Sequence, residues 1–152
     1  MTKAQKGMKY LGIGYFMIVL FGVLLGGLFI WSYSHSFEFH KAGMMQSVLL
    51  PLSYNIIINV LCWNACMKAA HDPTSAVYPL AMCSFSLFLE AYHFVSKMME
   101  YGTAYAFDTV PWISLTLYIL TIIVALKLKK EAAASKAEDG FSYGNSKHLV
   151  VK

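Results

Sequence analysis

The sequence predicts an all-α membrane protein, a four-helix transmembrane bundle with short loops and with both termini on the cytoplasmic side. Hydrophobic residues make up 58% of its 152 residues and charged residues only 13%, about half the charged share of an ordinary soluble domain. The apolar residues gather in four segments, each close to the length of about 20 residues that a membrane-crossing helix needs. Lysines, which orient membrane proteins, are concentrated at the ends of the chain.

The first predicted span covers residues 10–31 and contains no charged residue. Lys3, Lys6 and Lys9 precede it, as basic residues do in a secretory signal. The apolar stretch is longer than the roughly 7–15 residues of a signal core, and no small-residue cleavage site follows it. We therefore expect a retained transmembrane helix rather than a cleaved signal.

The second and third predicted spans cover residues 45–67 and 77–96. Pro51 and Pro79 lie near the starts of these segments, where a missing backbone N–H is tolerated. The connection between them, residues 69–75, contains histidine, aspartate and proline and therefore predicts a short polar turn.

The fourth predicted span covers residues 109–128, with Asp108 or Thr109 as the capping residue and Pro111 in the first turn. We expect one transmembrane domain over residues 1–130. The remainder, 131–152, is alanine-rich and charged at first and then polar and glycine-containing. That composition predicts a cytoplasmic tail that is helical only briefly and otherwise disordered.

Lysine placement predicts which side of the membrane each connection faces. The N-terminal tail, the middle connection and the C-terminal end carry most of the lysines, whereas Lys41 and Lys97 are the single lysines of the other two connections. Positively charged segments stay in the cytoplasm. Trp31 and Trp112 then lie at the outer interface, where tryptophan is favoured.

Composition also argues against several functions. All 12 basic residues are lysine, so the bidentate arginine contacts that recognise phosphates and guanine edges are absent. No phosphate-cradling glycine loop or nucleophilic triad occurs in the sequence. We therefore expect no nucleic-acid or nucleotide partner, no cofactor and no enzymatic activity.

One carboxylate within the predicted membrane segments, Glu90, is the leading candidate for an intramembrane polar site. His93 follows it by one turn, and Asn55 and Asn59 lie on the neighbouring span. A buried acid is costly in a membrane and faces protein or a water-filled cavity. Two interpretations remain open: a proton- or cation-handling site, or a protonated glutamate that holds helices together by hydrogen bonds.

Metal binding is weakly indicated and is not predicted. Glu90-x-x-His93 has the spacing of half a di-iron site, but such a bundle needs a second copy of the motif and two further glutamates. His35, Glu38 and His40 lie together in the first outer connection. Three mixed residues on a short loop fall short of a zinc site, so we expect a solvated loop.

Small and polar residues at helical spacing predict helix packing. Gly22 and Gly26 form a G-x-x-x-G motif, which allows two helix backbones to approach closely. The partner is either another helix of the same chain or a second copy of the protein. On the second span, Asn55, Asn59, Cys62 and Cys66 follow one another along one helix face, which favours packing over the lining of a solute path.

Two functions remain open at this level. The first is a non-catalytic, multi-pass membrane protein that organises membrane or serves as an accessory subunit of a larger complex. Its partners are the lipid bilayer and other membrane proteins or a second copy. The second is a small transporter, channel or proton- or cation-handling subunit centred on Glu90. The expected location is the plasma membrane or an endomembrane, with an organellar inner membrane as an alternative.

Overall fold

The computed structural model describes residues 1–33, 42–101 and 109–147, and it describes side chains in residues 1–32, 50–100 and 112–137. Within these ranges the chain forms four long α-helices and one short 3-10 helix. They are α1 (Lys3–Tyr33), α2 (Ala42–His71), η2 (Pro73–Ala76), α3 (Val77–Tyr101) and α4 (Thr109–Lys147). The candidate loop residues His35, Glu38 and His40 lie outside the described residues.

Local capping explains where α1 begins and where α2 is separated from α3. The Thr2 hydroxyl accepts a hydrogen bond from the Gln5 backbone N–H at 3.2 Å, and the Gln5 side-chain oxygen accepts one from the Thr2 N–H at 2.7 Å. This reciprocal capping box starts the helix well before the apolar segment. Asp72 caps η2 by accepting a hydrogen bond from the backbone N–H of Thr74. Because α2 continues to His71 and η2 begins at Pro73, the non-helical connection is shorter than the predicted turn over residues 69–75.

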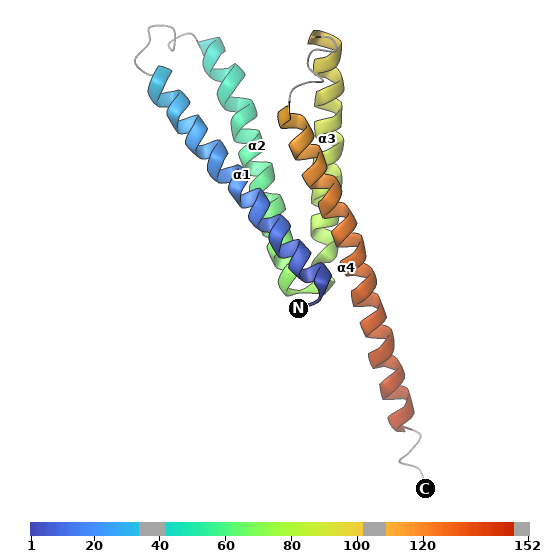
Figure 1. Cartoon of the computed structure of the whole chain (residues 1–152). Coiled ribbons are helices and arrows are strands. Elements are labelled where there is room, and N and C mark those ends of the chain that lie inside the picture. The colour runs from blue at the N-terminus through green and yellow to red at the C-terminus, as the bar shows by residue number, and fades with distance from the viewer. Residues whose placement is uncertain (34–41, 102–108, 148–152) are drawn as a thin grey trace.

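Helix α4 is longer than the predicted span and continues to Lys147, through most of the segment assigned to a polar tail. Alanine, lysine and glutamate in residues 131–138 are strong helix formers, which explains the extension. Figure 1 shows α4 projecting well beyond the other helices toward the C-terminus.

Three helices are long and apolar enough to cross a membrane: Lys3–Ser32, Leu50–His71 and Trp112–Ala137. The sequence analysis expects four spans, and α3 does not qualify among the described residues. Its 25 residues suffice in length, but Glu90, His93 and several serines and tyrosines dilute its apolar character. The described part of the chain is thus all-helical and holds three candidate membrane-spanning helices.

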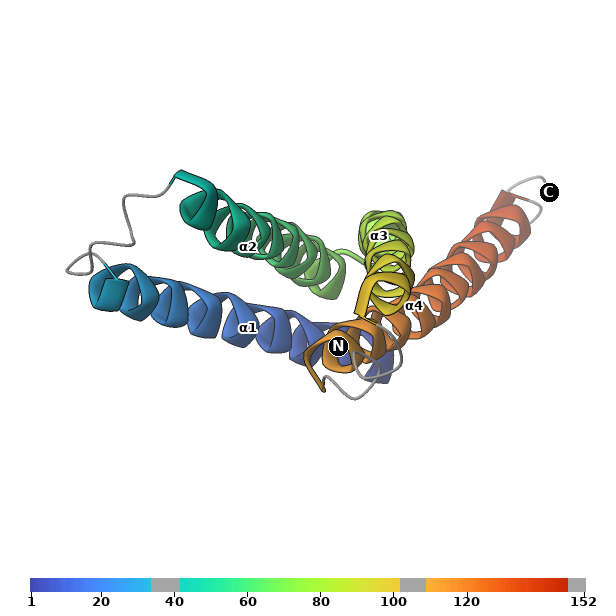
Figure 2. The same ribbon diagram turned by 90° about the horizontal axis from the view of Figure 1, so that it is seen from above.

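The helices form two hairpins that meet at one end and diverge at the other (Figure 1). Helix α1 packs most extensively against α2, and α3 against α4. The N-terminus and η2 lie at the end where the hairpins meet, which we call the closed end. At the opposite, open end, the view from above shows α1 and α2 leading away from α3 and α4 (Figure 2).

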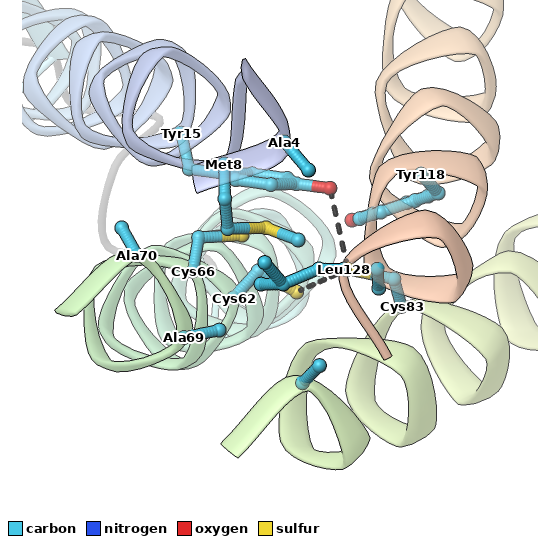
Figure 3. Packing of buried hydrophobic residues seen from close by; sticks show 12 residues of the cluster. Ala4, Met8, Tyr15, Cys62, Cys66, Ala69, Ala70, Cys83, Tyr118 and Leu128 are labelled. Atoms are coloured by element: carbon cyan, nitrogen blue, oxygen red, sulfur yellow. Dashed lines mark hydrogen bonds between the residues drawn. The ribbon is translucent and has the colours of Figure 1, made fainter. Parts of the chain in front are cut away.

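A buried cluster at the closed end joins all four helices (Figure 3). The Thr121 hydroxyl of α4 donates to the Leu117 carbonyl at 2.8 Å, so it accepts from the Tyr15 hydroxyl of α1, 3.0 Å away. The Tyr15 oxygen also lies 3.4 Å from the Cys83 sulfur of α3. Cys83 in turn lies 3.7 Å from Cys62 of α2. Each helix therefore contributes a polar atom to one connected network.

Close packing surrounds this network. The rings of Tyr15 and Tyr118 stack with their centroids 6.0 Å apart. The Lys68 ammonium lies 4.5 Å from the centroid of the Tyr78 ring, a cation–π contact that links α2 to the start of α3. We call the cluster of Tyr15, Cys62, Cys83, Tyr118 and Thr121 the core network.

Candidate functional site

A cleft of about 700 Å³ lies between the two hairpins and is lined by residues of all four helices. Its walls differ in character. Helix α1 contributes apolar side chains, among them Ile18, Phe21 and Leu25. Helices α2 and α3 contribute most of the polar groups that face the same space. The cleft is therefore apolar on one side and polar on the other.

Four polar residues singled out from the sequence line this one cleft: Asn55, Asn59, Glu90 and His93. Asn59 is buried, Glu90 is half-buried, and Asn55 and His93 are exposed. Residues 55–59 and 90–93 lie on different helices, so their approach depends on how α2 and α3 pack.

The two asparagines hydrogen-bond to their own helix. The Asn55 amide nitrogen donates to the Pro51 carbonyl at 3.2 Å, and the Asn59 amide nitrogen donates to the Asn55 carbonyl at 2.7 Å. These bonds occupy one donor of each amide. Each amide also carries an oxygen, an acceptor that an occupant of the cleft can use.

Glu90 and His93 bring titratable groups into the cleft. Across the described residues, no salt bridge joins Glu90 to a lysine. The ion pair on this helix is instead between Lys97 and Glu100, whose charged atoms lie 2.8 Å apart on an exposed surface. Glu90 is therefore a carboxyl group that faces a mostly apolar space without a lysine partner in the described chain.

Three further polar residues line the cleft, Tyr54 of α2, Tyr92 of α3 and Ser114 of α4. Sequence reasoning did not identify them, because a single tyrosine or serine in an apolar span carries no periodic signal. For Tyr54 the sequence gave a partial indication, because this residue directly precedes the candidate site residue Asn55.

The predicted stripe on α2 divides between two environments. Asn55 and Asn59 line the cleft, whereas Cys62 and Cys66 are fully buried at the closed end. One helix face thus passes from the cleft into the core. Over the described residues, no group of three or more histidine, cysteine, aspartate or glutamate side chains could hold a metal ion.

The glycine motif lies against α2. A Cβ atom added at Gly26 would lie 2.6 Å from Cδ2 of Leu52, and one added at Gly22 would lie 3.4 Å from Cγ1 of Ile56. Gly12, which sequence reasoning missed, is also tight: its added Cβ would lie 3.1 Å from the Met67 sulfur. Glycines therefore permit the close approach of α1 and α2 along much of their length.

Comparisons with protein-family models, with curated proteins and with solved structures yield no match.

Proposed function

We propose that the chain is a non-catalytic, multi-pass membrane protein that acts as a membrane organiser or as an accessory subunit of a larger membrane complex. In this proposal all four helices cross the membrane and both termini are cytoplasmic. The observation that carries it is the lateral cleft lined by all four helices. A cleft of this kind presents a protein surface to other components of the bilayer.

The inclusion of α3 among the spans is supported by its surroundings. It packs alongside α4 and contributes Cys83 to the core network between the other helices. Its titratable mid-helix residues Glu90 and His93 line the cleft, where a polar group is less costly than against lipid. The low overall apolarity of α3 is thus compatible with a span in a bundle.

The topology can be tested by labelling introduced cysteines with a membrane-impermeant maleimide in intact cells. Ser36→Cys and Ala104→Cys should react from outside, whereas Gln5→Cys and Asn145→Cys should not. The unsubstituted protein is a suitable blank, because its three native cysteines are fully buried. If α3 does not span, the chain crosses three times and Asn145→Cys becomes accessible from outside, which would overturn the four-span proposal.

The organiser function can be tested by photo-crosslinking from the cleft. A benzoyl-phenylalanine at Phe21 lies in the cleft wall, and one at Leu24 is the matched control outside it. The two native side chains are 60% and 56% exposed, so general accessibility is nearly equal. In native membranes, Phe21 should give an adduct of discrete mass, whereas Leu24 should give only the mixture expected of bulk lipid. The same mixture from both positions would contradict the proposal.

A second function is favoured by the convergence of Glu90, His93 and Asn59 on one cleft, since intramembrane acids often serve proton or cation transfer. Glu90→Gln removes the titratable proton and keeps the shape. If the chain handles protons or cations, this variant should lose flux in reconstituted vesicles and keep its melting temperature. Glu100→Gln, the same change on an exposed part of α3, should keep both. Vesicles of the unsubstituted protein that show no flux would exclude this alternative.

A further inference from the structure

The floor of the cleft is formed by one residue from each helix, one helical turn beyond the core network on α1, α2 and α4 and one turn beyond its neighbour Ser86 on α3. Ile18 follows Tyr15 on α1, and Ser114 precedes Tyr118 on α4. On the other wall, Asn59 precedes Cys62, and Glu90 follows Ser86, whose hydroxyl lies 3.9 Å from the Cys62 sulfur. The cleft is therefore open on one side and closed at this depth by packed side chains.

This closure decides which kind of occupant fits. A membrane-spanning helix has a diameter of about 10–12 Å and must continue through the bilayer. It cannot continue past the contact between Tyr15 and Thr121, whose oxygens are 3.0 Å apart. A single-chain amphiphile can end at the floor. The cleft volume of about 700 Å³ also lies within the range of roughly 300–1,000 Å³ that small-molecule sites occupy.

The polar groups of the floor decide the chemistry of the head group. Among the described residues that line the cleft, Glu90 is the acidic one and none is a lysine. An ammonium group complements a carboxylate and donates up to three hydrogen bonds. The amide oxygen of Asn59 and the hydroxyl oxygen of Ser114 are further acceptors at the same depth. The apolar wall of α1, with Phe21 and Leu25, suits an aliphatic chain.

We propose that the cleft binds a single-chain lipid amine, with its protonated amine at Glu90 and its chain along α1. This inference rests on the proposed role of the cleft as a site for membrane components and names the chemical class that it retains. His93, one turn farther out on α3, lines the same space. A neutral imidazole there offers one more acceptor for the amine.

The test measures binding to the purified full-length protein in nanodiscs of zwitterionic lipid, by native mass spectrometry. Three probes of matched chain length differ in the head group: octadecylamine carries an amine, octadecanol a hydroxyl and stearate a carboxylate. Octadecylamine should bind at least about tenfold more tightly than octadecanol, the size expected of a hydrogen bond to a charged group. Stearate should bind most weakly, because its charge repels that of Glu90.

Two variants show whether Glu90 is the origin of this ranking. Glu90→Gln should bind octadecylamine and octadecanol about equally, whereas Glu100→Gln, outside the cleft on the same helix, should keep the preference. Equal binding of octadecylamine and octadecanol by the unsubstituted protein would overturn the amine assignment, even if Glu90→Gln fails to fold. A preference that survives in Glu90→Gln would overturn it as well. Neither result affects the photo-crosslinking contrast between Phe21 and Leu24, so failure here is distinguishable from failure of the organiser proposal.

Discussion

The two ends of the bundle use polar side chains in different ways. At the closed end, the Tyr15 hydroxyl of α1 bonds to Thr121 of α4 and contacts Cys83 of α3, so polar atoms join separate helices. At the open end, the amide nitrogens of Asn55 and Asn59 donate to carbonyls of their own helix. Bonds between helices hold the hairpins together, whereas bonds within a helix leave the space between them open.

This difference shows that a polar residue in an apolar helix does not by itself fix helices to one another. Its effect depends on whether a partner from another helix lies within reach. Asn59 and Cys62 are one turn apart on α2, yet Asn59 lines the cleft and Cys62 belongs to the core network. Substitutions at the closed end should therefore lower the free energy of unfolding, whereas substitutions at the open end should change binding in the cleft.

The largest expected effect is that of removing the Tyr15 side chain. Tyr15 is fully buried against Tyr118, so Tyr15→Ala leaves a cavity and should lower the free energy of unfolding by about 3 kcal/mol or more. Phe21→Ala at the open end should change it by less than about 0.5 kcal/mol, because lipid replaces the lost contacts. Equilibrium unfolding in mixed micelles measures both. Equal losses would remove the distinction between the two ends.

A smaller effect is expected at the glycine contact between α1 and α2. Gly26→Leu forces a side chain into Leu52 and should lower the free energy of unfolding by about 1–3 kcal/mol. Gly27→Leu is the matched control, because an added Cβ at Gly27 has no neighbour within 4 Å. If the motif instead mediates self-association, Gly26→Leu should abolish a crosslinked dimer and leave the melting temperature unchanged.

The smallest effect is a pH dependence of the capped connection at the closed end. The carboxylate of Asp72 accepts hydrogen bonds from the Thr74 hydroxyl at 2.7 Å, the Ser75 hydroxyl at 2.8 Å and the Thr74 N–H at 3.0 Å. These bonds, led by that from the Thr74 side chain, lower the pKa of Asp72 below its usual value. Because the folded pKa is the lower one, the stabilisation is present above the unfolded pKa of about 3.9 and is lost as the pH falls through the folded pKa.

Melting temperatures of the unsubstituted protein and of Asp72→Ala, measured from neutral to acidic pH, test this dependence. The unsubstituted protein should melt higher at neutral pH, and the difference should shrink as the pH falls below about 4. A difference that stays constant down to strongly acidic pH would show that the Asp72 carboxylate does not contribute through these bonds.

The sequence by itself determined the helical class, the approximate positions of the four helices and four of the polar residues that line the cleft, though not Tyr54, Tyr92 or Ser114. Each of these follows from the composition of one segment or from the periodicity of its apolar and polar residues. Both are local properties that can be read from the residues of that segment alone. Glu90 and His93 were identifiable because ionisable side chains are rare in apolar helices. Three of the four expected spans also have the length and apolarity to cross a membrane.

Only the tertiary structure decided that the hairpins meet at one end, that Tyr15 and Thr121 join them and that Asn59 and Glu90 form the floor of a shared cleft. These contacts depend on the rotation and tilt of whole helices. Rotation and tilt are determined by the packing of many side chains at once. A periodic stripe identifies the face of a helix but not the neighbour of each residue, which is why the α2 stripe gave no indication that it divides between cleft and core.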